Sequence, residues 1–124
     1  MMRLRCARHT DQLDIIVKFY QQILGLDVIG SFKDHQGYDG VFLGLPGADW
    51  HLEFTTSEQK PEHIPDHDDL LVFYPDSEQE YQRIIKAIEE NHIASEVPVN
   101  PYWQENGVMI KDPDGFLIVI RKFT

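Results

Sequence analysis

The chain has 124 residues, of which 42% are apolar and 26% charged, and its net charge at pH 7 is −10. This composition is typical of one compact globular domain, and its acidity would repel nucleic-acid phosphates and anionic lipid headgroups, so neither nucleic acid nor a membrane is an expected partner. One cysteine excludes an internal disulfide, and no apolar run is long enough for a signal peptide or a membrane span, which favours a cytoplasmic protein.

The first half of the chain is predicted to form a strand, a helix and three further strands. Apolar and polar residues alternate at 3–9. Apolar side chains then recur at helical spacing, with Asp11 as the expected cap and Gly25 as the left-handed stop. Turn-rich segments separate three strand candidates, at 28–32, 38–45 and 49–56.

The same order of elements repeats after a proline-containing linker at 58–68, which separates the halves 1–57 and 69–124. Ser77 and Glu80 form a capping box at the start of a second helix. The predicted elements are a strand at 70–74, a helix with apolar residues at 81–88, a weak strand at 94–97 and a hairpin of strands at 107–110 and 116–121. The chain is therefore predicted to be a single α+β domain of two βαβββ modules that share one core. A ferredoxin-like fold, the alternative, would leave extra strands unexplained.

Three short motifs carry a resemblance to a known superfamily. They are Leu24-Gly25-Leu26 at the end of the first helix, Leu52-Glu53-Phe54 in the fourth strand and Asp112-Pro113-Asp114-Gly115-Phe116 before the last strand. In this order, and with the doubled pattern, they resemble the vicinal-oxygen-chelate superfamily of glyoxalases, bleomycin-resistance proteins and dioxygenases. The resemblance implies a mixed or antiparallel sheet curled round a small-molecule cavity, and a homodimer.

The resemblance also implies metal-ligand positions on the first and last strands of each half. The first falls on Arg5, where a histidine is expected, and the second on Glu53, which matches. The third falls at or beside Asp69, and the fourth on Val119, where a glutamate is typical. Because arginine and valine offer no lone pair, no metal cofactor is expected. If a divalent metal does bind, its candidate ligands are Glu53, His51, His9 and Asp69.

Arg5 and Glu53 are the predicted centre of a ligand-binding cavity. If the first and fourth strands are neighbours, the guanidinium takes the place of the metal and neutralises Glu53 or anchors a carboxylate or phenolate of the ligand. The alternative is a buried salt bridge that only holds the strands in register. Trp50 is expected in the core, and Trp103 at the cavity rim. The predicted cavity residues are Arg5, Glu53, His51, Phe73, Trp103 and Met109.

Other reactive side chains are expected to be inert. Cys6 lies on the apolar side of the first strand and is predicted to be buried, and His63 and His67 belong to a solvated linker. The leading hypothesis is thus a non-metal small-molecule binding protein that sequesters its ligand. The alternatives are a divalent-metal-dependent lyase, isomerase or dioxygenase that uses Glu53, and a regulatory or immunity partner with a vestigial cavity.

Overall fold

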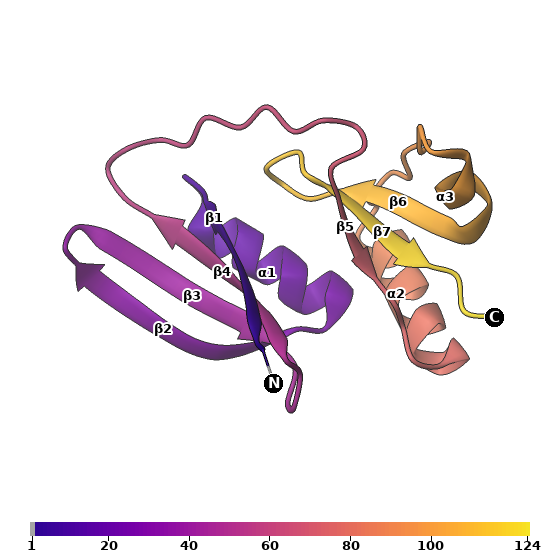
Figure 1. The fold of residues 1–124 in the computed structure, drawn as a ribbon, viewed down its shortest axis with the longest axis horizontal. Coiled ribbons are helices and arrows are strands. Elements are labelled where there is room, and N and C mark those ends of the chain that lie inside the picture. Colours follow the sequence, from indigo (N-terminus) through magenta and orange to yellow (C-terminus); the bar gives the residue numbers. More distant parts are fainter. Residues whose placement is uncertain (1) are drawn as a thin grey trace. The chain divides into compact units, whose positions relative to one another are not determined.

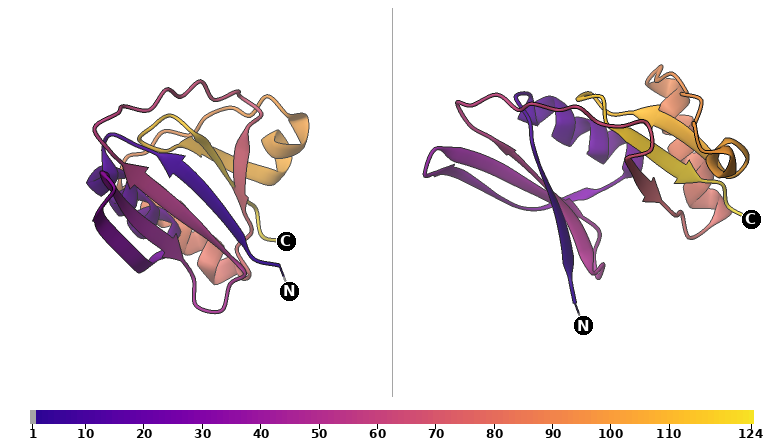
Figure 2. Two further views of the ribbon diagram at one scale, coloured as in Figure 1. Left: turned by 60° about the vertical axis from the view of Figure 1, so that its left-hand side comes forward. Right: turned by 45° about the horizontal axis from the view of Figure 1, so that its top comes forward.

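The computed structural model describes residues 2–124. Contacts between residues divide the chain into two units, one ending at Glu62 and the other beginning at His63, so the boundary falls inside the predicted linker. Residues 57–69 contain no helix or strand (Figure 2). That the two units together make one domain stays a prediction. None of the helices in residues 2–124 has the length and apolar character needed to cross a membrane.

The first unit has the predicted order of one strand, one helix and three strands (Figure 1). Its elements are β1 (Leu4–His9), α1 (Leu13–Leu24), β2 (Asp27–His35), β3 (Tyr38–Gly44) and β4 (Trp50–Thr56). The sheet order is β1-β4-β3-β2, with β1 parallel to β4 and the other pairs antiparallel. The parallel pair makes β1 and β4 neighbours although more than 40 residues of chain separate them.

α1 covers one face of this sheet with the predicted apolar stripe, in which Tyr20 packs on Phe54 of β4 at 5.0 Å between ring centroids. Gly25 ends the helix at φ 70°, and the Leu26 N–H donates to the Tyr20 carbonyl, which confirms the predicted left-handed stop. The predicted cap, Asp11, is wrong. The N-cap residue is Gln12, because the buried Thr10 hydroxyl accepts the Gln12 N–H and the helical turn starts one residue later.

The second unit contains a three-stranded sheet in the order β5-β7-β6. Its elements are β5 (Leu70–Phe73), α2 (Glu78–Glu90), α3 (Pro101–Asn106), β6 (Gly107–Lys111) and β7 (Leu117–Arg121). β5 runs parallel to β7, and β6 runs antiparallel to it. The Ser77 hydroxyl accepts the Glu80 N–H at 3.0 Å, which confirms the predicted cap of α2.

The strand predicted at 94–97 is wrong, and the helix α3 was not predicted. Glu96 makes one isolated bridge to Met109 and donates its N–H to the Met109 carbonyl at 2.7 Å. Pro98 has no N–H with which to continue a ladder, so the pairing ends there. The α3 helix begins instead at a signal that the sequence carries, since the Asn100 side chain accepts the Tyr102 N–H and a proline occupies the first helical position.

Buried apolar side chains lie on both faces of the second sheet. Strand alternation places Ile110, Ile118 and Ile120 on one face. The helix α2, whose Ile84 and Ile88 are buried, lies alongside this sheet (Figure 1). The other face carries an apolar cluster that we call the Trp103 cluster. It consists of Trp103, Met109, Leu117 and Val119, with Leu70 and Val72 packed against it.

Candidate functional site

The face of the first sheet opposite α1 gathers four of the candidate residues, Arg5, His9, His51 and Glu53. β1 and β4 pair so that Arg5 lies opposite His51 and Ala7 lies opposite Glu53. Because side chains alternate along a strand, Arg5, His51 and Glu53 project from the same side of the sheet. We call this surface the Arg5 face; its residues are Arg5, His9, Phe32, Phe42, His51 and Glu53.

Arg5 is the centre of the contacts on this face. Its Nε donates a hydrogen bond to His51 Nε2 at 2.9 Å, and its Nη1 lies 3.6 Å from Glu53 Oε1. The guanidinium carbon lies 4.8 Å from the centroid of the Phe42 ring. The Arg5 side chain is 51% exposed and that of Glu53 13%, so this ion pair is not the buried salt bridge of the alternative interpretation. The guanidinium therefore reaches solvent while its carboxylate partner does so only slightly.

The hydrogen bond from Arg5 determines which nitrogen of a neutral His51 ring carries the proton. A guanidinium has only donors, so His51 Nε2 must be the acceptor and the ring proton lies on Nδ1. The lone pair with which Nε2 would bind a metal is therefore engaged by Arg5. A metal ion at this nitrogen would first have to displace the guanidinium.

The other candidate metal ligands do not complete a site. His9 contacts Thr55 Oγ1 through Nδ1 at 2.8 Å, and its Nε2 lies 3.0 Å from the Gln59 carbonyl oxygen, so both ring nitrogens are engaged within the first unit. Asp69 lies in the second unit, where its carboxylate accepts the Asp66 N–H at 3.3 Å. Within residues 2–124, no three His, Cys, Asp or Glu side chains lie close enough together to hold a metal ion. That this chain binds no metal cofactor stays a prediction.

Phe42 is a residue of this face that sequence reasoning missed. Its ring lies beside both groups, with its centroid 4.8 Å from the Arg5 guanidinium carbon and 5.8 Å from the centroid of the His51 ring. The signal was the alternation in the third strand, which places Tyr38, Gly40 and Phe42 on one side. That side could be identified as the Arg5 face only once the pairing of Phe42 with Glu53 was known.

The candidate residues of the second unit serve its core. Trp103, 9% exposed, packs with Met109 in the Trp103 cluster, whereas Trp50 is only partly buried, so the expectation that Trp50 is the core tryptophan and Trp103 the rim residue is wrong. Gly107 lets the side chains of Trp103 and Val119 pack closely against the backbone of β6. A Cβ at this position would lie 2.6 Å from Val119 Cγ1 and 3.1 Å from Trp103 Cε3. Phe73, also a predicted cavity residue, is partly buried on β5.

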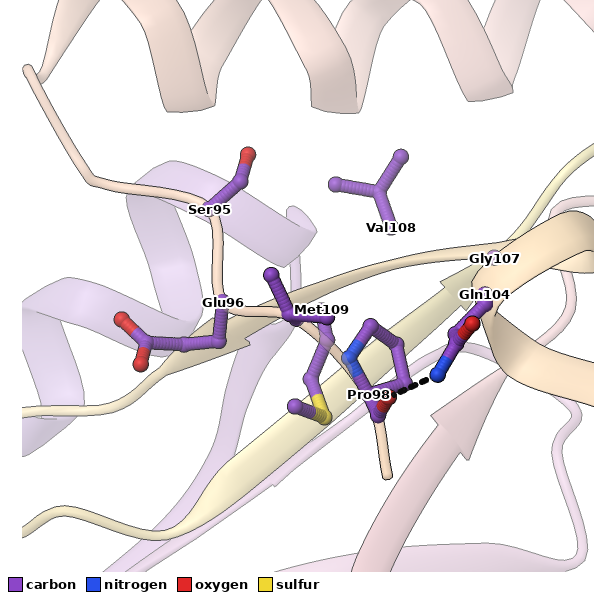
Figure 3. Close-up of a pocket in the computed structure, with 8 residues that line it drawn as sticks. Ser95, Glu96, Pro98, Gln104, Gly107, Val108 and Met109 are labelled. Carbon is purple, nitrogen blue, oxygen red and sulfur yellow. Dashed lines mark hydrogen bonds between the residues drawn. The ribbon is translucent and has the colours of Figure 1, made fainter. Parts of the chain in front are cut away.

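A pocket of about 270 Å³ lies in the second unit between residues 95–98, α3 and β6 (Figure 3). Met109 lines it, and the Gln104 amide donates to the Pro98 carbonyl at 2.8 Å across it. The Glu96 carboxylate lies 3.8 Å from the Lys111 ammonium. The pocket is smaller than the roughly 300–1,000 Å³ of most ligand sites, and two of its polar side chains, Gln104 and Glu96, already have partners. The Arg5 face is therefore the stronger candidate.

Two further expectations are changed by the structure. Cys6 is exposed, not buried, because α1 packs mainly over β3 and β4 and leaves the apolar side of β1 uncovered within this unit. Of the linker histidines, His67 is exposed as expected, but the His63 ring packs on Phe116 at 4.8 Å between ring centroids.

Comparison with known proteins gives consistent family matches. The chain matches the models of the YycE-like N-terminal domain over residues 4–55 and the YycE-like C-terminal domain over residues 68–122. It is 46% identical over 118 residues to the uncharacterised protein YycE of Bacillus subtilis (strain 168), which covers 94% of this chain and 85% of that protein. A crystal structure of a YycE protein of unknown function from Bacillus subtilis, 44% identical, aligns over 98% of this chain and 90% of that chain with a TM-score of 0.85.

More distant structures share the fold. Glyoxalase I of Leishmania major is 20% identical and aligns over 98% of this chain and 86% of its own with a TM-score of 0.74. The fosfomycin resistance protein FosX of Listeria monocytogenes is 15% identical and aligns over 97% of this chain and 89% of its own with a TM-score of 0.67. At these identities the likeness is one of fold.

Proposed function

The chain belongs to the YycE-like family, within the vicinal-oxygen-chelate superfamily, and on that premise we propose that it binds a small organic molecule at the Arg5 face without a metal ion. The fold is that of glyoxalases and fosfomycin-resistance proteins, which establishes the superfamily and not the reaction. The function must therefore be argued from the side chains of this chain.

The observation that carries the proposal is the position of the Arg5 guanidinium. It holds two side chains of this face that would serve a metal or act as a base, His51 through a hydrogen bond and Glu53 through an ion pair. Such contacts support binding of a ligand more than its turnover, because a general base needs a free lone pair directed at the substrate.

The guanidinium also has donors left for a ligand. Within residues 2–124, no protein acceptor lies at hydrogen-bond distance from Nη2, and the 3.6 Å between Nη1 and Glu53 exceeds a hydrogen bond. Because the side chain is half exposed, an oxygen of a carbonyl, phenolate or carboxylate can reach these N–H groups. Sequestration of an organic ligand through Arg5 is thus the function that this geometry supports best.

The test is a thermal-shift and calorimetric screen of small carboxylates and phenols, run beside Zn²⁺, Ni²⁺, Mn²⁺ and Fe²⁺. A ligand that binds only the folded state adds about 2.7 kcal/mol to stability at 100 times its Kd. Arg5→Ala is expected to abolish the shift. Arg83→Ala is the matched control, since Arg83 is another exposed arginine, paired with Glu80 at 2.9 Å, and lies in the second unit.

The metal arm of the screen decides between the proposal and its rival. Stoichiometric metal in the purified protein, with a stabilisation that Glu53→Ala abolishes, would overturn the proposal and favour a metal-dependent lyase, isomerase or dioxygenase. A ligand whose affinity is the same in Arg5→Ala as in the parent protein would place the binding site elsewhere.

A further inference from the structure

Two phenylalanines beside Arg5 lie over glycines of the opposing strand. In the β2–β3 hairpin, Phe32 pairs with Gly40 and Phe42 pairs with Gly30. A Cβ at Gly40 would lie 2.3 Å from Phe32 Cε1 and Cζ, and one at Gly30 would lie 3.1 Å from Phe42 Cδ2. Each ring therefore occupies the space that a side chain on the neighbouring strand would otherwise fill.

The two rings and Arg5 form a continuous strip across the sheet. The Phe32 and Phe42 ring centroids are 5.9 Å apart, and the Arg5 guanidinium lies 4.8 Å from the centroid of Phe42. The path from the Phe32 centroid over Phe42 to the Arg5 guanidinium is therefore about 11 Å at most, which is long enough for a ligand of two fused rings and an acidic group.

This strip is not part of the packed core of the first unit. α1 packs on the opposite face, and both phenylalanines remain partly exposed. Glycine within a strand weakens it, so glycines opposite two phenylalanines carry a cost in stability. Their effect is to keep two aromatic rings, whose planes are tilted by 48° to one another, partly open beside a half-exposed cation.

Resting on the proposed function, we infer that the ligand of the Arg5 face is a flat aromatic monocarboxylate. Its carboxylate pairs with the Nη groups of Arg5, whose planar fork suits two parallel hydrogen bonds, and its ring stacks on one of the two phenylalanine rings and contacts the tilted second one at an angle. A single negative charge fits better than two, because Glu53 lies 3.6 Å from the same guanidinium and repels a second charge.

The test compares 2-naphthoate with decahydro-2-naphthoate, which has the same charge and a similar size but no flat ring. Calorimetric titration is expected to show about tenfold tighter binding of the aromatic acid, the size of effect that aromatic pairing supplies. In the amide NMR spectrum, the signals of Gly30 and Gly40 beneath the rings are expected to shift with 2-naphthoate and to stay nearly unchanged with the saturated acid.

Variants locate the stacking surface. Phe32→Leu and Phe42→Leu are expected to weaken 2-naphthoate binding about tenfold and to leave the saturated acid unaffected. Phe19→Leu is the matched control, since Phe19 is also partly buried but lies on α1, on the other side of the sheet. Because the glycine shifts are measured on the parent protein, the test stands even where a leucine variant folds poorly.

The outcomes separate the two proposals. Equal affinity for both acids, with binding lost in Arg5→Ala, overturns the aromatic ligand and keeps the Arg5 site. Binding of neither acid overturns the aromatic carboxylate, while the screen of other carboxylates and phenols decides the proposed function. If Phe32→Leu and Phe42→Leu lower stability but leave the affinity for both acids unchanged, the rings only pack the strands and do not bind the ligand, which overturns the inference.

Discussion

The two sheets of this protein differ most in the face opposite their long helix. In the first sheet, that face carries a half-exposed arginine, a glutamate and a histidine. In the second sheet, the corresponding face is closed by the Trp103 cluster, which includes Val119 at the position where the superfamily resemblance implies a metal-binding glutamate. The two units therefore differ on this face, which is polar and partly exposed in the first and apolar and packed in the second.

The closure of the second face depends on a short helix and a glycine. α3 places Trp103 on the sheet, and Gly107 leaves the room in which the indole approaches Val119. The first unit has no helix on the corresponding face within the described residues, and its glycines make room for Phe32 and Phe42 instead. The variants below test this contrast.

The largest expected effect comes from removal of the indole. Trp103→Ala should lower the free energy of unfolding by about 3–5 kcal/mol, because a large buried aromatic leaves a cavity. Urea denaturation measures the loss. Tyr102→Ala, at the exposed neighbouring position, is the control and should cost less than about 1 kcal/mol. Similar losses in both variants would contradict a special role for Trp103 in closing the face.

A glutamate at position 119, where the superfamily resemblance implies a metal ligand, should destabilise the folded protein and create no metal site. Val119→Glu is expected to cost about 3 kcal/mol at pH 7, since it loses apolar packing and buries a polar group without a partner. Burial raises the pKa of such a carboxyl group, so the folded state binds the proton more tightly and the loss should be smaller at pH 4 than at pH 7. Urea titrations at both pH values test this, with Val119→Gln as the non-titrating control. Rescue by Zn²⁺ would show a metal site.

An intermediate effect is expected on the Arg5 face from Gly40→Ala. The added Cβ would meet the Phe32 ring at 2.3 Å, so the ring must move and the cost should be about 1–3 kcal/mol. The double-mutant cycle with Phe32→Ala supplies the control, because the same substitution should cost much less once the ring is gone. Equal costs in both backgrounds would mean that the backbone, and not the ring, requires glycine.

The smallest effect is expected from Arg5 itself. Arg5→Ala should change the free energy of unfolding by less than about 1 kcal/mol, because its ion pair is half exposed. Chemical denaturation beside Arg5→Lys, which keeps the charge, measures it. A loss above about 2 kcal/mol would make Arg5 a structural clamp between β1 and β4 and weaken the ligand-binding proposal.

Local patterns predicted the elements whose signals lie within a few residues of each other. The stop at Gly25 and the cap at Ser77 were both expected and found, since each depends on hydrogen bonds between residues close in the chain. Among the failures, the weak strand at 94–97, the tryptophan assignment and the burial of Cys6 depend on partner strands and helices distant in the chain. The Asp11 cap is a local signal that failed, because the helix begins one residue later, after Gln12.

The features of the candidate site also divide into those that residue type determines and those that only the tertiary structure determines. The sequence by itself determined that Arg5 and Val119 offer no lone pair to a metal, and with the superfamily resemblance it predicted that Arg5 and Glu53 lie at two ligand positions. Only the tertiary structure decided that Arg5 also binds His51, that Phe32 and Phe42 lie beside it over glycines, and that Trp103 fills the second face. The physical reason is that residue type limits which bonds a side chain can make. The register between strands distant in sequence determines which of those bonds form.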